Sequence, residues 1–185
     1  MSRIFLETER LVLRQFQSDE ADLLLELDSD PDVRRYLLMP DAPKREDAEH
    51  TLTHFLDWYA KCPHYGFWAI EEKPNGDFVG WFHFRPSDDN ADEIEIGYRL
   101  KKAYWGKGYA TELTRVCIAK AFEEWAVGKV MASADVEHQA SLRVMQKAGM
   151  RYEADFLYDG QYPSVKYALT RAEYDDRDQG LKNPA

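Results

Sequence analysis

The sequence contains no run of apolar residues long enough for a membrane-spanning helix, which needs about 20 such residues in a row. Its first residues, MSRIFLETERLVLRQF, alternate apolar and polar side chains, whereas a signal peptide has a continuous apolar core. Cysteine is scarce. Only Cys62 and Cys117 occur, and their spacing suggests no partner, which suits a reducing compartment. Together these absences predict a cytoplasmic protein that does not associate with a membrane.

Positive charge is also in short supply. The chain has 24 Lys and Arg against 34 Asp and Glu, which gives a formal net charge of −10. We therefore expect no broad binding to nucleic acid or to anionic membranes. The cations gather around residues 99–107 and 143–151. Such clusters are often solvated surface, but the first surrounds two glycines and is consistent with a small anionic ligand.

The chain does have the length and apolar content to bury a core. It has 185 residues, of which 44% are hydrophobic. This favours a single domain over residues 1–185, with a core at about 6–169 and a polar, peripheral tail at 171–185. Hydrophobic periodicity predicts strands within 4–16, 65–73, 77–85, 93–100, 129–137 and 151–170, and helices at 18–30, from 30 onward, at 44–61, 109–125 and 138–149.

Local signals mark the ends of several of these elements. Ser18 is expected to cap the first helix, Pro63 to end the third, and Gly149 to close the last. The order of elements fits an α/β (α+β) fold with a mixed, mostly antiparallel sheet of about seven strands and helices on both faces. It does not fit a doubly wound fold, in which strand and helix alternate throughout.

The stretch YWGKGYATEL, residues 104–113, places Gly106 and Gly108 directly before a helical pattern. Glycine at such a junction lets the backbone approach another group closely, and at a helix start that group is often a phosphate. A P-loop would need Ser or Thr after Lys107, and a dinucleotide fingerprint would need glycine in place of Thr111. The remaining interpretations are a phosphate-binding turn of another kind and a plain structural turn.

A second segment, HQASLRVMQKAGM at residues 138–150, follows a predicted strand and closes with Lys-x-Gly-hydrophobic. Together with WGKGYA at residues 105–110, it makes the sequence resemble the GNAT superfamily of acetyl-CoA-dependent N-acetyltransferases. The stretches LETERLVLRQF, EIGYRL and YWGKGYATEL resemble the branch that contains the ribosomal-protein N-terminal acetyltransferases. The resemblance covers roughly residues 6–169 and implies a GNAT fold and transfer of an acetyl group to a primary amine.

The resemblance also implies where acetyl-CoA binds. It places the pyrophosphate over the amides of Gly106–Thr111 and the pantetheine arm alongside the strand that precedes them. In the second segment, the resemblance implies cofactor contacts from the first residues of the predicted helix. The implied cofactor-binding residues are Tyr98, Arg99, Leu100, Gly106, Lys107, Gly108, Tyr109, Ala110, Thr111, His138 and Ser141.

Three positions depart from the family pattern. Trp105 stands where Gln or Arg is usual, and His138 replaces an asparagine. Met145 occupies the place where many relatives carry a tyrosine that serves as general acid. That acid is absent from this chain, so protonation of the leaving thiolate by water or by Tyr98 stays open.

Acetyl transfer to an amine is helped by a general base. Glu93 and Glu95 point to one face of their predicted strand, and Ile94 and Ile96 point to the other. Glu95 is the preferred candidate base, acting directly or through water, although both acids can equally be solvent-facing surface. Ser141 is the candidate for a polar contact to the thiol or the pantetheine; its alternative role is to cap the helix.

The pKa of the acceptor helps to rank substrates. An α-amine with a pKa of about 7.7–8.0 costs about 1 kcal/mol to deprotonate at pH 7, whereas a lysine amine at about 10.4 costs about 4.6 kcal/mol. This favours a peptide or protein N-terminus. A small-molecule amine (antibiotic, polyamine or amino acid) is an alternative, and so is a non-catalytic CoA-binding sensor. From the family layout, the acceptor is expected near Tyr36, Tyr65 and Trp68.

No metal is expected. The pair His50 and His54 lies four residues apart on a predicted helix, but no third ligand is evident, and acetyl transfer needs no metal. The expected partners are acetyl-CoA and the amine, and the chain is expected to be a monomer or a homodimer.

Overall fold

The computed structural model describes residues 3–182 except residues 38, 40, 63, 89, 91 and 126. The predicted helix stop at Pro63 therefore lies outside the described residues. The chain divides into two compact units, one of residues 1–85 with 97–112 and the other of residues 86–96 with 113–185. The prediction of a single domain stays a prediction, and each unit is described by itself.

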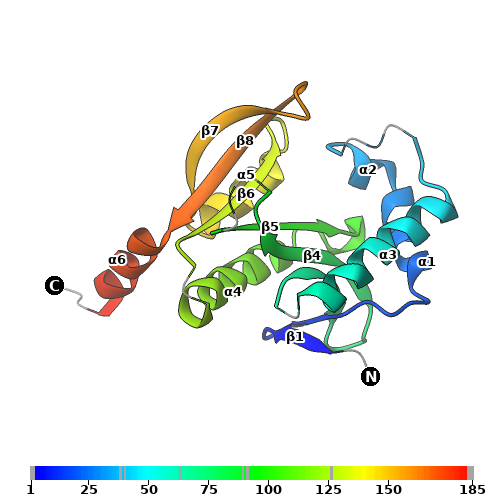
Figure 1. The fold of residues 1–185 in the computed structure, drawn as a ribbon, viewed down its shortest axis with the longest axis horizontal. Coiled ribbons are helices and arrows are strands. Elements are labelled where there is room, and N and C mark those ends of the chain that lie inside the picture. Colours follow the sequence, from blue (N-terminus) through cyan, green and yellow to red (C-terminus); the bar gives the residue numbers. More distant parts are fainter. Residues whose placement is uncertain are drawn as a thin grey trace. The chain divides into compact units, whose positions relative to one another are not determined.

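The first unit contains an antiparallel part of the sheet and the early helices (Figure 1). Neighbouring strands pair in chain order, and a tight turn at residues 74–76 joins the third to the fourth, as PNG predicts. Its elements are β1 (Ile4–Glu7), β2 (Leu11–Arg14), α1 (Ala21–Ser29), α2 (Pro31–Arg34), α3 (Arg45–Lys61), β3 (Gly66–Glu72), β4 (Phe78–Pro86) and the short 3-10 helix η1 (Lys102–Tyr104).

The core of this unit forms where the apolar stripe of α3 meets α1 and the sheet. Leu52 and Phe55 lie on that stripe, as the helical periodicity predicts, and the ring of Phe55 stacks on Phe67 at 4.2 Å. Leu24 and Leu27 come from α1 and are almost fully buried. This packing holds α1 and α3 together in one cluster.

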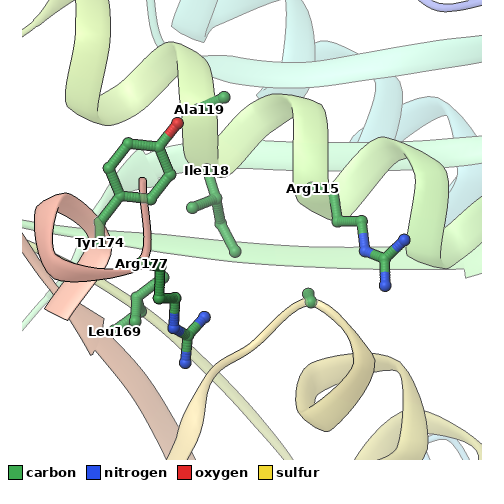
Figure 2. Close-up of a pocket in the computed structure, with 7 residues that line it drawn as sticks. Arg115, Ile118, Ala119, Leu169, Tyr174 and Arg177 are labelled. Atoms are coloured by element: carbon green, nitrogen blue, oxygen red, sulfur yellow. The ribbon is translucent and has the colours of Figure 1, made fainter. Parts of the chain in front are cut away.

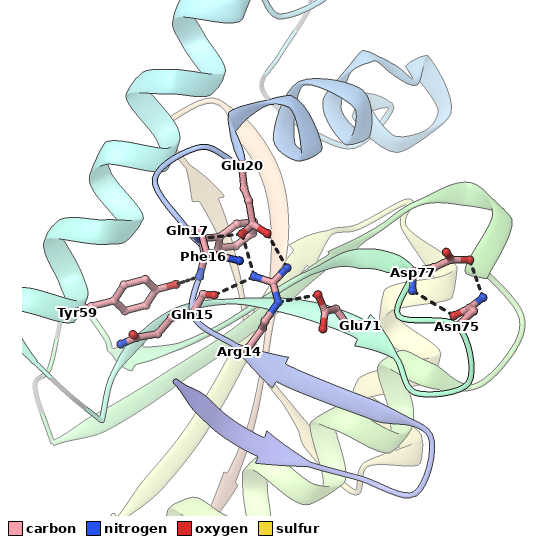
Figure 3. A network of polar contacts seen from close by, with 9 residues as sticks. All are labelled: Arg14, Gln15, Phe16, Gln17, Glu20, Tyr59, Glu71, Asn75 and Asp77. Atoms are coloured by element: carbon pink, nitrogen blue, oxygen red, sulfur yellow. Dashed lines mark hydrogen bonds and ion pairs between the residues drawn. The ribbon is translucent and has the colours of Figure 1, made fainter. Parts of the chain in front are cut away.

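The first helix begins later than predicted. Its N-cap is Glu20, not Ser18, and Glu20 makes no side-chain cap hydrogen bond. Its carboxylate instead accepts the Gln17 amide at 2.8 Å and pairs with the buried guanidinium of Arg14 at 2.7 Å (Figure 3). Arg14 also pairs with Glu71 at 2.6 Å. The carboxylate at the helix start is therefore engaged by Arg14, which also reaches the distant Glu71, and a local capping signal does not reveal this.

The second unit contains the parallel pair of the sheet. Strand β5 (Glu93–Leu100) runs parallel to β6 (Lys129–Asp135), with Glu93, Ile94 and Glu95 opposite residues 129–131. The pairing that follows is antiparallel, β6 with β8 and β8 with β7. The other elements are α4 (Tyr109–Glu124), α5 (Gln139–Lys147), β7 (Arg151–Tyr158), β8 (Tyr162–Thr170) and α6 (Arg171–Lys182). Residues 97–100 of β5 and residues 109–112 of α4 belong to the first unit.

The strand order is β1-β2-β3-β4-β5-β6-β8-β7, so the described residues form eight strands where the sequence predicts about seven. The fold class is confirmed as mixed α/β with a mostly antiparallel sheet. One face of the helix at residues 109–124 packs into the core, where Ala110, Leu113, Cys117 and Ala121 are all buried. The β7–β8 hairpin turns at Asp159 and Gly160, which both have positive φ.

The C-terminal tail is helical over residues 171–182, and its residues 171–177 are half-buried or exposed. It forms α6, and the Tyr174 ring packs on Phe122 with ring centroids 4.9 Å apart. The Tyr174 hydroxyl donates to Glu123 at 2.7 Å, and Arg171 donates to the Phe122 carbonyl. Polar side chains thus attach this helix to α4. The polar composition of the segment does not reveal that attachment.

Candidate functional site

The two glycines of the turn have the backbone conformation that their sequence position suggests. Gly106 has φ +75° and Gly108 has φ +83°, a region that other residues rarely adopt. Helix α4 begins at Tyr109, and the amide of Glu112 makes its first hydrogen bond, to the Gly108 carbonyl at 3.0 Å. The amides before Glu112 have no carbonyl four residues back within the helix, so they form a group of donors at its positive end.

Arg10, from the turn between β1 and β2, holds this segment. Its Nη1 donates to the Lys107 carbonyl at 2.9 Å, and its Nε donates to Glu112 Oε2 at 2.7 Å. The Arg10 amide also donates to Glu112 Oε1 at 3.3 Å. One arginine therefore bridges both ends of the glycine turn. Sequence analysis missed it because nothing in the sequence joins residue 10 to residues 107–112.

The Lys107 ammonium lies among groups of its own unit. It is 3.6 Å from Glu72 Oε1 and 4.5 Å from the centroid of the Tyr104 ring. The Tyr109 hydroxyl donates to the same Glu72 carboxylate. The hydrogen bond from Tyr109, with the charge of Lys107, lowers the pKa of Glu72. Lys107 is thus at the predicted turn, but part of its charge balances Glu72.

Three predicted cofactor-binding residues, Tyr98, Arg99 and Leu100, lie at the end of β5, before the glycine turn. Pairing of β5 with β6 covers Glu93–Glu95, and β5 continues for five more residues to Leu100. The Leu100 carbonyl accepts a hydrogen bond from the Trp105 indole at 2.8 Å. The Tyr98 ring lies against Phe82, with centroids 6.5 Å apart.

The Arg99 side chain is directed toward α1. Its Nη1 pairs with the nearly buried Asp28 at 2.6 Å, and its guanidinium lies 5.0 Å from the centre of the Trp81 ring. Its charge is therefore largely matched by Asp28. The Arg99 backbone is closely approached by β4, since a Cβ on Gly80 would lie 2.0 Å from the Arg99 carbonyl oxygen.

The second unit places the two candidate bases in different surroundings. Glu93 pairs with Lys129 at 3.4 Å and accepts a hydrogen bond from the Asn90 amide at 3.1 Å. Glu95 is half-buried on the same face of β5, opposite Met131 in the parallel register. The predicted alternation is confirmed, because Ile94 and Ile96 are buried.

His138 caps α5 in place of the family's asparagine. Its Nδ1 accepts the Ser141 amide at 3.5 Å, and burial lowers the pKa of its imidazole. A neutral imidazole can accept such a hydrogen bond. Ser141 is therefore in the first turn and is not the cap. Met145 is buried in the core, so its side chain packs there.

Not all the residues expected near the acceptor are exposed enough to contact it. Trp68 is fully buried and stacks on Phe5 at 4.2 Å, so it belongs to the core. Tyr36 and Tyr65 are half-buried.

A cavity of about 240 Å³ lies in the second unit (Figure 2). Two guanidinium groups border it. Arg115 donates to the Lys147 carbonyl at 3.1 and 2.7 Å, and Arg177 donates to the Gly149 carbonyl. Both therefore satisfy carbonyls at the C-terminal end of α5. None of the predicted site residues lines this cavity.

No helix among the described residues is long and apolar enough to cross a bilayer. No group of three or more His, Cys, Asp or Glu side chains in the described part of the chain could hold a metal ion.

Comparison with known proteins identifies the family. The model of the acetyltransferase (GNAT) domain matches residues 10–151. YkkB of Bacillus subtilis is 36% identical over 153 residues, which are 80% of this chain and 85% of YkkB. The FsC-acetyl coenzyme A-N(2)-transacetylase of Aspergillus fumigatus is 28% identical over 183 residues, which are 91% of this chain and 77% of that enzyme.

The fold is shared with solved acetyltransferases. One of them is RimL, a ribosomal L7/L12 alpha-N-protein acetyltransferase in complex with coenzyme A. It superposes with a TM-score of 0.75 and 18% identity, covering 91% of this chain and 98% of RimL. The chain therefore belongs to the GNAT acetyltransferase family and is an acetyl-CoA-dependent N-acetyltransferase.

Proposed function

We propose that the enzyme acetylates the α-amine of a peptide or protein and holds the pyrophosphate of acetyl-CoA at the glycine turn. The observation that carries the cofactor site is the conformation of Gly106 and Gly108 directly before α4. Without side chains, these residues let a phosphate approach the amides of residues 108–111, and the helix dipole favours its charge. Lys107 adds positive charge beside Glu72.

The backbone of Tyr98, Arg99 and Leu100 binds the pantetheine arm in this proposal. It continues β5 beyond the residues that pair with β6, and an extended arm can add to a strand through main-chain hydrogen bonds. His138 and Ser141 at the start of α5 contact the cofactor nearer its thiol. Tyr109, Ala110 and Thr111 contribute main-chain amides.

Acetyl-CoA supplies a thioester whose carbonyl carbon is attacked by the neutral amine. The new C–N bond forms, the C–S bond breaks, and the amine loses one proton. Glu95 accepts that proton, directly or through water. Glu93, which pairs with Lys129 and Asn90, is the second candidate. The departing thiolate takes a proton from water or from Tyr98, since Met145 supplies none.

The acceptor class follows from the cost of deprotonation. A carboxylate base meets a cost of about 1 kcal/mol for an α-amine at pH 7 and about 4.6 kcal/mol for a lysine amine. The likeness to RimL, named for α-N-protein acetylation, agrees with this choice. The Aspergillus relative carries a different name, FsC-acetyl coenzyme A-N(2)-transacetylase, and a small-molecule amine is the second candidate.

A matched acceptor panel tests the proposal. Each assay combines enzyme, acetyl-CoA and one amine, and measures thiol release together with the mass of the acetylated product. The panel contains short peptides with a free α-amine, the same peptides with the α-amine blocked and a lysine added, and polyamines. We expect the highest kcat/KM for free α-amines. A higher kcat/KM for a polyamine or another small amine would contradict the peptide acceptor.

A further inference from the structure

Arg10 contacts the glycine turn through both its guanidinium and its backbone amide. It reaches the turn from the loop between β1 and β2, almost a hundred residues earlier in the chain. Its Nη1 donates to the Lys107 carbonyl at 2.9 Å. Its Nε and Nη2 both contact Glu112 Oε2, at 2.7 and 2.6 Å. Lys107 lies between the two glycines and Glu112 lies in the first turn of α4, so the contacts span the whole turn.

The first consequence concerns charge. Glu112 is an acid in the first turn of α4, where it stabilises the helix through the dipole. The same carboxylate would repel a phosphate bound at the N-terminus of that helix. Burial raises the pKa of Glu112, but hydrogen bonds from Thr8 and Arg10 outweigh it and lower the pKa, so the group is ionised at neutral pH. A cation must therefore balance Glu112 before an anion can bind there.

The second consequence concerns the conformation of the turn. Two glycines with positive φ are permissive, and an untethered turn of this kind loses much conformational freedom when it binds a ligand. Arg10 fixes the carbonyl between them. Its guanidinium also lies 4.5 Å from the centre of the Tyr109 ring, at the first residue of α4. The Arg10 side chain nevertheless stays 42% exposed.

We propose that Arg10 is a positioning residue for the pyrophosphate of acetyl-CoA. It holds the glycine turn in its binding conformation and cancels the charge of Glu112, so that the amides at the start of α4 are available to the phosphates. This inference rests on the proposed cofactor site. It adds Arg10, which lies outside the glycine motif, to that site. It also explains why the acid Glu112 is tolerated there.

The experiment measures binding by isothermal titration calorimetry for two ligands, CoA and pantetheine, which lacks the phosphates. The variants are Arg10→Gln, Glu112→Gln, the double variant, and Arg3→Gln as a control. Arg3 is an exposed arginine at the start of the chain. We expect Arg10→Gln to weaken CoA binding by about tenfold or more, the effect of about 1.4 kcal/mol, and to leave pantetheine binding unchanged. Arg3→Gln should bind CoA as the parent does.

The double variant separates a positioning role from a merely structural one. If Arg10 acts partly by cancelling Glu112, then Arg10→Gln with Glu112→Gln should recover part of the lost CoA affinity. Equal CoA affinity in Arg10→Gln and the parent would overturn the inference. So would an equal loss for CoA and pantetheine, or a double variant as weak as Arg10→Gln. A parent protein that binds no CoA would instead overturn the proposed cofactor site itself, and this inference with it.

Discussion

Replacing Gly108 with alanine is the perturbation that connects the glycine turn to cofactor binding. Gly108 has φ +83°, and an added Cβ would lie 3.6 Å from Arg10 Nη2, an ordinary contact. The folded state therefore suffers mainly from the left-handed backbone conformation, which costs roughly 1–2 kcal/mol for a residue with a Cβ. For a chain of this length, that lowers the melting temperature by about 2–8 °C.

The same substitution should also weaken CoA binding, and this effect is separate from the loss of folding stability. In the parent, CoA at a hundred times its Kd should stabilise the folded state by about 2.7 kcal/mol, or about 5–11 °C. In the proposed site, a Cβ at residue 108 would keep the phosphate from the amides. If it weakens binding tenfold, the same CoA concentration contributes only about 1.4 kcal/mol, so the rise should fall to about 3–6 °C.

Gly160→Ala is the matched control. Gly160 has φ +69°, and nothing lies within 4 Å of an added Cβ. It turns the β7–β8 hairpin and belongs to no predicted site. Thermal melts with and without CoA should show that both variants lose similar stability, but only Gly108→Ala loses part of the CoA-dependent rise. Equal rises in the two variants would refute the proposed placement of the phosphate.

Three further outcomes are expected. Glu95→Gln should retain CoA affinity and lower kcat by roughly 10² or more, and its rate should rise only at higher pH, where the amine is already neutral; near-full activity at pH 7 would exclude Glu95 as the base. Because Cys117 is fully buried and burial raises the pKa of its thiol, a thiol reagent should label Cys62 in the native protein and Cys117 only after unfolding; native labelling of Cys117 would contradict this burial. The pKa of Glu112 is lowered from 4.5, so its contribution to stability is present above that value and is lost as pH falls through the folded-state pKa; Glu112→Gln should therefore flatten the acid limb of stability measured by urea unfolding, and an unchanged limb would argue against the pairing.

Periodicity and turn residues were enough to predict most of the fold. The helix at Arg45–Lys61, the hairpins at residues 74–76 and 159–160, and the glycine turn are local features, and the structure confirms them. The prediction that Ser18 caps the first helix was wrong. The N-cap is Glu20, whose carboxylate pairs with Arg14, and the other partner of Arg14 is Glu71. The helix at α6 was not predicted, because Arg171 and its neighbours attach it through hydrogen bonds, and these do not depend on an apolar stripe.

The candidate site likewise has features with a local sequence signal and features that depend on distant contacts. Sequence analysis could find Gly106 and Gly108 because positive φ leaves a signal in residue type. It could not find Arg10, whose role depends on a contact to residues about a hundred positions away. It also assigned Trp68 to the acceptor region, although the ring is part of the core. Aromatic residues on strands serve both purposes, and only burial distinguishes them.

A structure of the protein with bound CoA tests the central claim most directly. We expect pyrophosphate oxygens about 3 Å from the main-chain nitrogens of residues 108–111, within hydrogen-bond distance. We also expect the guanidinium of Arg10 still on Glu112 and the Lys107 carbonyl. Pyrophosphate bound elsewhere, for example beside Arg115 and Arg177 at the cavity in the second unit, would contradict the account.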